Sequence, residues 1–134
     1  MKINKKVSVV IPVLNEEESL FELNQRIINI LLNITSTYEI IYINDGSTDG
    51  TQKKLEQIKE ENNNLVKIIN FRKNMGKSVA LDEGFKISSG ELIFTLDADL
   101  QDLPEEIPKF LEVLEKGNFD VVNGWRHKRK DKFK

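Results

Sequence analysis

The chain has 134 residues, of which 39% are hydrophobic and 31% charged, and this composition is typical of a single globular domain. It contains no cysteine and one histidine, His127, which excludes disulfides, thiolate-bound metals and multi-histidine metal sites. The formal net charge is −2 and no apolar run approaches the ~20 residues that span a bilayer. With no secretory signal after its basic start, we expect the chain to be cytoplasmic.

Five short runs rich in valine, isoleucine or phenylalanine predict strands, and such runs are typical of buried parallel sheets. They cover residues 7–12, 39–44, 66–71, 92–96 and 120–123. An apolar stripe from Leu20 to Ile34 predicts a helix after the first strand, with Asn15 as N-cap and Glu18 at the capping-box position. Three weaker helices are expected at 51–61 after an Asp49 cap, at 76–88, and at 104–116 from Pro104.

This alternation predicts an α/β fold, an open and mostly parallel sheet with helices on both faces, whose ligands bind beyond the carboxyl ends of the strands. The first such loop carries Glu16, Glu17 and Glu18, where a dinucleotide-binding fold would have a glycine-rich turn for phosphate. Glu17 and Glu18 are expected to act as helix-capping charges. For Glu16, helix capping and ligand binding are equally good alternatives.

The second loop, NDGSTDGT at 44–51, places Asp45 at a strand tip. A carboxylate there can accept hydrogen bonds from a nucleobase N–H or a ribose hydroxyl, and the alternative is a purely structural Asx turn. The fourth strand leads into Asp97-Ala98-Asp99, with Gln101 and Asp102 close behind. Magnesium and manganese prefer such oxygen ligands and keep positions open for phosphates, so this cluster can clamp a diphosphate. The alternative is that residues 99–102 cap the next helix.

The chain ends in a basic segment, 126–134, with six Lys or Arg residues and one Asp. It is either a solvated tail or a site for phosphate or anionic lipid. Arg126, which follows the last predicted strand, is a planar donor suited to phosphate.

Taken in order, these motifs resemble glycosyltransferase family 2. The matching runs are VVIPVLNE at 9–16, NDGSTDGT at 44–51, DADLQ at 97–101, PE at 104–105 and GWR at 124–126. Their order and spacing extend over nearly the whole chain, which is far more specific than any one motif. Within the family the likeness is greatest to the polyprenyl-phosphate glycosyltransferases, the group that includes dolichyl-phosphate mannose synthase.

The resemblance implies a GT-A fold and a set of site residues. The nucleoside pocket would be lined by Pro12, Leu14, Glu16, Ile43 and Asp45. The ribose and diphosphate would face Asp97, Ala98 and Asp99, and the divalent metal, Mg or Mn, would lie on Asp99 and Gln101 with Asp97 nearby. By the same resemblance Arg126 would contact the donor or acceptor phosphate, and Asp99 and Arg126 would be the catalytic residues.

The implied reaction is transfer of a hexose, with inversion, from a UDP- or GDP-sugar to a polyprenyl phosphate, and no nucleic acid is expected as a partner. We expect a nucleotide-sugar-binding domain at 1–125 and the basic start of an acceptor-side segment at 126–134. The acceptor site is then incomplete, and a longer protein would lie at the inner face of the membrane.

Two other functions are considered. A phosphoaspartyl hydrolase would use Asp97 as nucleophile, although Gln101 stands where such enzymes carry Thr or Val. A nucleotide-sugar-binding module without activity is the other alternative.

Overall fold

The computed structural model describes residues 2–99, 104–109, 111–112 and 121–122. Its strands are β1 (Val7–Val13), β2 (Tyr38–Asn44), β3 (Val66–Asn70), β4 (Leu92–Thr95) and β5 (Val121–Val122). Its α-helices are α1 (Leu20–Ile34), α2 (Thr51–Asn62) and α3 (Lys77–Ile87), and two 3-10 turns are η1 (Asn63–Leu65) and η2 (Pro104–Glu106). The predicted strands are therefore confirmed, with ends that differ by at most one residue.

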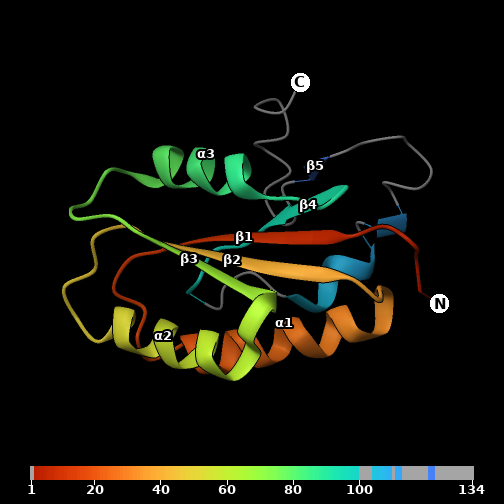
Figure 1. Cartoon of the computed structure of the whole chain (residues 1–134), viewed down its shortest axis with the longest axis horizontal. Coiled ribbons are helices and arrows are strands. Elements are labelled where there is room, and N and C mark those ends of the chain that lie inside the picture. Colours follow the sequence, from red (N-terminus) through yellow and green to blue (C-terminus); the bar gives the residue numbers. More distant parts are fainter. Residues whose placement is uncertain (1, 100–103, 110, 113–120, 123–134) are drawn as a thin grey trace.

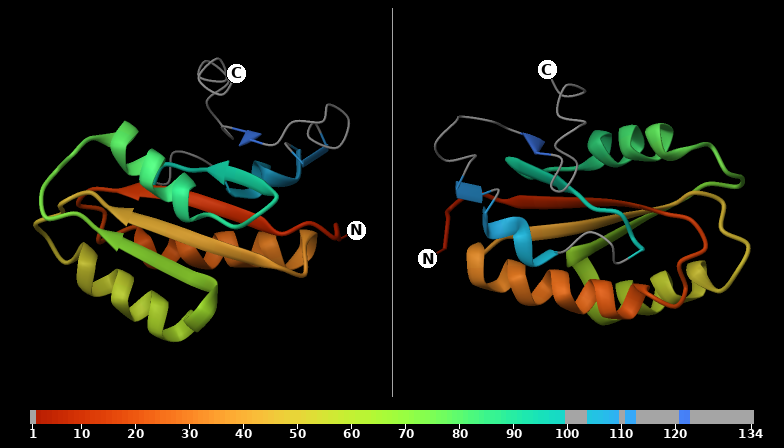
Figure 2. Two further views of the ribbon diagram at one scale, coloured as in Figure 1. Left: turned by 45° about the horizontal axis from the view of Figure 1, so that its top comes forward. Right: turned by 180° about the vertical axis from the view of Figure 1, so that it is seen from behind.

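The strands form one sheet in the order β3-β2-β1-β4-β5, and every neighbouring pair is parallel. Helices α1 and α2 cover one face and α3 covers the other (Figures 1 and 2). The chain moves outward from β1 to β3 and then returns to place β4 on the other side of β1. Because parallel crossovers are right-handed, this reversal moves the connecting helix to the opposite face. The predicted open parallel sheet with helices on both faces is confirmed.

Two apolar clusters hold these layers together. The larger lies under α1 and α2, where the stripe residues Leu23, Ile27 and Leu31 are fully buried. The smaller lies under α3 and contains Val10 and Ile43. A Cβ at Gly84 of α3 would lie 2.4 Å from Val10 Cγ1 and 2.7 Å from Ile43 Cδ1, so the glycine lets α3 pack directly on the sheet. Burial on both faces explains the near-continuous apolar runs in the strands.

The predicted start of the first helix is wrong. Helix α1 begins at Leu20, after Ser19, and Asn15 lies well before it with φ of 53°. Asparagine tolerates this left-handed conformation, and its short amide can then bind nearby backbone. The Asn15 Oδ1 accepts hydrogen bonds from Thr48 N at 2.8 Å and Asp49 N at 3.3 Å. Asn15 therefore ties the loop after β1 to the loop after β2 instead of capping the helix.

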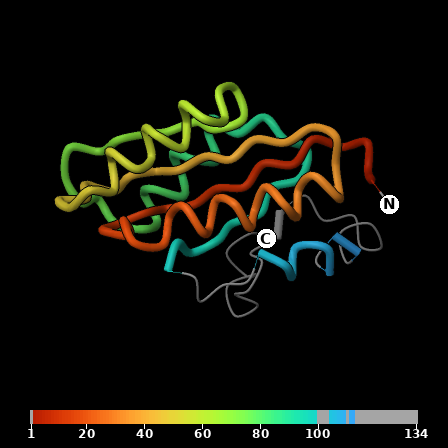
Figure 3. Tube along the Cα trace, turned by 90° about the horizontal axis from the view of Figure 1, so that it is seen from below, coloured from red at the N-terminus to blue at the C-terminus, as the bar shows by residue number. Residues whose placement is uncertain are grey.

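The helix expected from Pro104 begins as the 3-10 turn η2, and residues 107–109 and 111–112 are helical. This segment runs beside α1 (Figure 3). Arg26 of α1 donates to both carboxylate oxygens of Glu105, from Nε at 2.9 Å and from Nη2 at 2.5 Å. The ion pair anchors the chain after β4 to α1. Residues 113–116 of the predicted helix lie outside the described part.

Candidate functional site

A cleft of about 330 Å³ opens beyond the carboxyl ends of β1, β2 and β4. It lies where the strand order reverses, the position at which open α/β sheets bind ligands. Seven residues singled out in the sequence line it: Pro12, Leu14, Glu16, Asp45, Asp97, Ala98 and Asp99. Four others that line it were not singled out: Val13, Asn74, Gly76 and Lys77. The topology therefore gathers side chains from four separate loops into one hollow.

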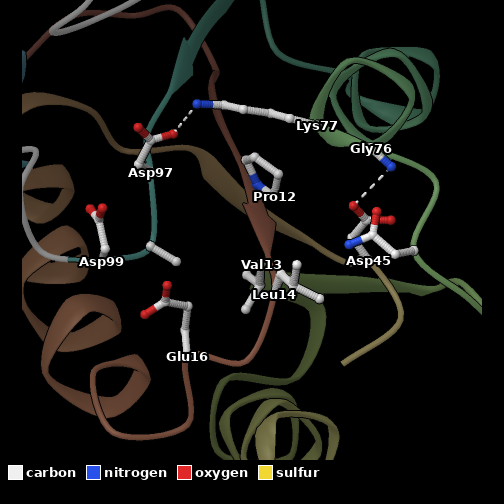
Figure 4. Close-up of a pocket in the computed structure, with 11 residues that line it drawn as sticks. Pro12, Val13, Leu14, Glu16, Asp45, Gly76, Lys77, Asp97 and Asp99 are labelled. Carbon is white, nitrogen blue, oxygen red and sulfur yellow. Dashed lines mark hydrogen bonds and ion pairs between the residues drawn. The ribbon is translucent and has the colours of Figure 1, made fainter. Parts of the chain in front are cut away.

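Asp45 lies on one side of the cleft, directly after β2, and its side chain is held by backbone groups (Figure 4). Its Oδ1 accepts a hydrogen bond from Met75 N at 2.7 Å, and Oδ2 accepts one from Gly76 N at 3.1 Å. The residue is only 5% exposed. Asp45 thus braces the start of α3. Each carboxylate oxygen has a second lone pair, so the group can also accept a hydrogen bond from a ligand in the cleft.

Three further carboxylates, those of Glu16, Asp97 and Asp99, stand on the opposite side of the cleft (Figure 4). Burial raises the pKa of Glu16, the negative charge of Asp99 raises it further, and a hydrogen bond from Ser19 opposes the shift. Like charges that are close in a partly desolvated site disfavour each other's ionised form. This side of the cleft therefore holds oxygen ligands whose mutual repulsion a bound cation would relieve.

Lys77, the first residue of α3, reaches across the top of the cleft and forms an ion pair with Asp97 (Figure 4). Among the described residues it is the one lysine or arginine that lines the cleft, against four carboxylates. The sequence does contain a signal for Lys77 as a site residue, because Gly76-Lys77 follows the third strand and begins a helix. Its reach toward Asp97, 20 residues away, depends on the packing of α3.

Ser19 fixes the Asp97-Ala98-Asp99 turn to the start of α1. Its hydroxyl donates to the Ala98 carbonyl oxygen at 2.7 Å, and the Glu16 Oε2 atom lies 3.4 Å from the same hydroxyl. The backbone N–H of Glu16 donates to Thr51 Oγ1 at 3.0 Å. The acidic side of the cleft is thus held by α1 and by the first residue of α2.

One predicted pocket residue lies elsewhere. Ile43 is fully buried in the cluster under α3 and does not line the cleft, because successive side chains of a strand point to opposite faces and this one points into the core. Gln101 and Arg126 lie outside the described residues.

Across the described ranges, no three acidic or histidine side chains are grouped so as to hold a metal ion by themselves. Within the same ranges, no helix is long and apolar enough to cross a bilayer.

Solved structures with the same arrangement of elements include a mannosyltransferase from Pyrobaculum calidifontis in complex with GDP-Man and Mn²⁺. It is 22% identical, with a TM-score of 0.64, over 84% of this chain and 33% of that one. Another is glucosyl-3-phosphoglycerate synthase from Mycobacterium tuberculosis in complex with UDP, 23% identical, with a TM-score of 0.66, over 84% of this chain and 41% of that one. The chain therefore has the GT-A fold.

The sequence is more similar to a group of curated bacterial enzymes. The undecaprenyl-phosphate 4-deoxy-4-formamido-L-arabinose transferase of Proteus mirabilis is 46% identical over 130 residues, which is 97% of this chain and 39% of the relative. The transferase of that name from Salmonella choleraesuis is 43% identical over 95% of this chain and 38% of the relative. The chain thus spans about two fifths of the length of these relatives. The family model described as glycosyl transferase family 2 matches residues 8–134, and the chain belongs to that family.

Proposed function

We propose that this chain binds the nucleoside diphosphate of a sugar donor in the cleft, and that the protein to which it belongs transfers the sugar to a polyprenyl phosphate with inversion. The observation that carries the proposal is the division of the cleft into two sides. Asp45, after β2, faces the Asp97-Ala98-Asp99 turn, after β4, across a hollow of about 330 Å³. One side suits the hydrogen-bonding edge of a nucleoside and the other suits a cation-bound diphosphate.

The acidic side of the cleft requires a divalent cation when a diphosphate is bound. Four carboxylates and one lysine line the described cleft, so a bare diphosphate would meet net repulsion. The donor set fits magnesium or manganese, which take oxygen ligands and keep positions for water and phosphate. Asp99 and Asp97 would supply two ligands, and Gln101, which lies outside the described residues, is the further candidate from the sequence. A bound ion would stabilise the charge of the departing nucleoside diphosphate.

A prenyl phosphate as acceptor is supported by the curated relatives, which are named as undecaprenyl-phosphate transferases and match nearly all of this chain. The sugar is a separate question. Those relatives are named for a substituted arabinose, a five-carbon sugar, whereas the sequence led us to expect a hexose. UDP and GDP both stay candidates for the donor, since the solved structures include one of each. The family match favours glycosyl transfer over the phosphoaspartyl hydrolase that we considered.

Isothermal titration of the 134-residue chain with UDP, GDP and inorganic phosphate, each in manganese and in chelator, tests the donor site. We expect one nucleoside diphosphate to bind at least tenfold more tightly with manganese, because the cation offsets the carboxylates. Inorganic phosphate should bind far more weakly, since it makes no nucleoside contact.

Asp99→Asn should abolish the manganese dependence of binding. The matched control is Asp82→Asn on the outer face of α3, where the aspartate pairs with Lys86 at 3.4 Å and lies outside the cleft. Equal nucleotide affinity in chelator and in manganese for the unchanged chain would contradict the assignment of the cation to this cleft.

A further inference from the structure

A second hollow, of about 530 Å³, lies next to the cleft between the loop after β3 and the outer face of α3. Phe71, Met75 and Val79 supply its apolar lining, and Arg72 and Lys73 supply two basic side chains. Met75 is 46% exposed and Val79 is 40% exposed, which places both among the large apolar side chains on the surface. We call this hollow, with these five residues, the basic groove.

The loop that builds the basic groove is held in place from the cleft. Gly46, with φ of 78°, lies so close to it that a Cβ there would be 2.4 Å from the Lys73 carbonyl carbon and 2.5 Å from Asn74 N. The Asp45 carboxylate accepts the N–H groups of Met75 and Gly76. Backbone contact and two hydrogen bonds therefore hold the backbone of Met75 in place at the surface.

The charges of the basic groove are available for an anionic partner. Arg72 and Lys73 are exposed, and neither forms an ion pair with any other residue that the structure describes. The one acidic side chain in the lining, Glu83, is paired with Lys86 at 3.1 Å. The groove thus combines an apolar surface with two basic side chains that form no ion pair with a described acidic residue.

The basic groove also lies at the same end of the molecule as the cleft. The loop from β3 to α3 leaves the carboxyl end of the sheet, beside the loops after β1 and β2 (Figure 1). Residues 74, 76 and 77 line the cleft and residues 71–73 and 75 line the groove, so one short segment borders both. A flat surface that contacted the groove would therefore lie alongside the mouth of the cleft.

We propose that the basic groove docks on the surface of an anionic bilayer. Met75 and Val79 enter the interface, and Arg72 and Lys73 contact lipid phosphates, which is how peripheral proteins combine apolar contact with charge attraction. The inference rests on the proposed function, because an acceptor that is a lipid phosphate has to be reached from the bilayer. Docking at this edge brings the cleft to the lipid headgroups.

Vesicle flotation tests the docking with no acceptor lipid present. The 134-residue chain is mixed with vesicles of phosphatidylcholine alone, or of phosphatidylcholine with phosphatidylglycerol, at low salt. We expect partitioning to the anionic vesicles that falls as salt rises. Each basic residue at an anionic surface contributes roughly fivefold to partitioning, so Arg72→Gln with Lys73→Gln should lower it by about 25-fold. Met75→Ser should lower it further through lost apolar contact.

Matched controls lie at the opposite end of the sheet. Lys2→Gln with Lys5→Gln removes two exposed lysines near the start of β1. Leu32→Ser removes a side chain that is 51% exposed at the far end of α1, close to the Ile3–Thr35 bridge. Both controls should change partitioning much less than the groove variants, because the altered side chains lie at the end of the sheet away from the docking surface.

Three results would overturn the proposal: no partitioning of the unchanged chain, equal partitioning to both kinds of vesicle, or equal losses in groove and control variants. Sedimentation of the same proteins would show whether the groove instead binds a second copy, and this too would overturn it. Nucleotide titration without vesicles is independent of docking, so a failure here is distinguishable from a failure of the proposed donor site.

Discussion

Asp45 shows how one side chain can have both a structural and a binding role. Its carboxylate is nearly buried and already accepts two backbone N–H groups from the loop before α3. The same oxygens border the cleft, where a nucleoside would lie. From the sequence, Asp45 has two alternative roles: it binds the nucleoside, or it is a structural turn residue. The structure shows a structural role that reaches 30 residues along the chain, and the binding role stays a prediction.

Asp45→Ala should weaken binding of the nucleoside diphosphate and also lower the melting temperature. A hydrogen bond to a charged group is worth about 1.5–3 kcal/mol, so the dissociation constant should rise at least tenfold. The drop in melting temperature follows because Met75 N and Gly76 N lose their acceptor. Calorimetry measures the first effect and thermal denaturation the second.

The control for this variant is Asp49→Ala. Asp49 accepts a hydrogen bond from Thr51 N at 2.9 Å and lies outside the cleft, so its loss should lower stability alone. If Asp45→Ala lowered stability in the same way but left nucleotide affinity unchanged, Asp45 would be a structural residue only.

At the scale of elements, one buried carboxylate, that of Glu39, connects neighbouring strands at the end of the sheet away from the cleft. Glu39 of β2 is 2% exposed and pairs with Lys67 of β3 at 2.8 Å. Its Oε2 accepts hydrogen bonds from Ser8 Oγ of β1 and from Ser89 N in the turn before β4, each at 2.6 Å. Burial alone would raise the pKa of Glu39, but these donors hold it at about 2, below its ordinary 4.5. The ionised group thus links three strands and the connection from α3.

The depressed pKa predicts how stability depends on pH. Because the folded-state pKa is the lower one, ionised Glu39 stabilises the fold fully above pH 4.5, and this contribution is lost as the pH falls from 4.5 toward 2. Glu39→Gln should therefore cost about 1–3 kcal/mol at pH 7 and show a weaker loss of stability on acidification. Urea denaturation at pH 7 and pH 3 measures both effects.

Glu60→Gln on the exposed side of α2 serves as the control, and it should leave the pH dependence unchanged. The same acid sensitivity in Glu39→Gln and in the unchanged chain would mean that other carboxylates control the acid response.

For the whole molecule, the cleft is where separate parts of the chain meet. Its lining comes from the loops after β1, β2 and β4 and from the start of α3, so a ligand there contacts both halves of the sheet. A ligand that binds only the folded state stabilises it in proportion to its affinity and concentration. Ligand binding in the cleft should therefore raise the melting temperature of the entire chain.

Manganese and the preferred nucleoside diphosphate together should raise the melting temperature by roughly 10 °C. A ligand at 100 times its dissociation constant stabilises by about 2.7 kcal/mol, and each kcal/mol shifts a domain of this size by roughly 3–5 °C. Either component alone should give a much smaller shift, because four carboxylates oppose a bare diphosphate. Differential scanning calorimetry gives the comparison, and equal shifts with and without manganese would contradict it.

The sequence by itself determined the strands, the helices, the parallel α/β fold and the placement of Asp45, Asp97 and Asp99 at one edge. These follow from local apolar patterns and from the rule that parallel strands end together. Only the tertiary structure decided that Asn15 bridges two loops, that Ile43 points into the core and that Lys77 pairs with Asp97. Each of these depends on the strand register or on a contact between residues 20 or more positions apart, and neither is encoded in a local pattern.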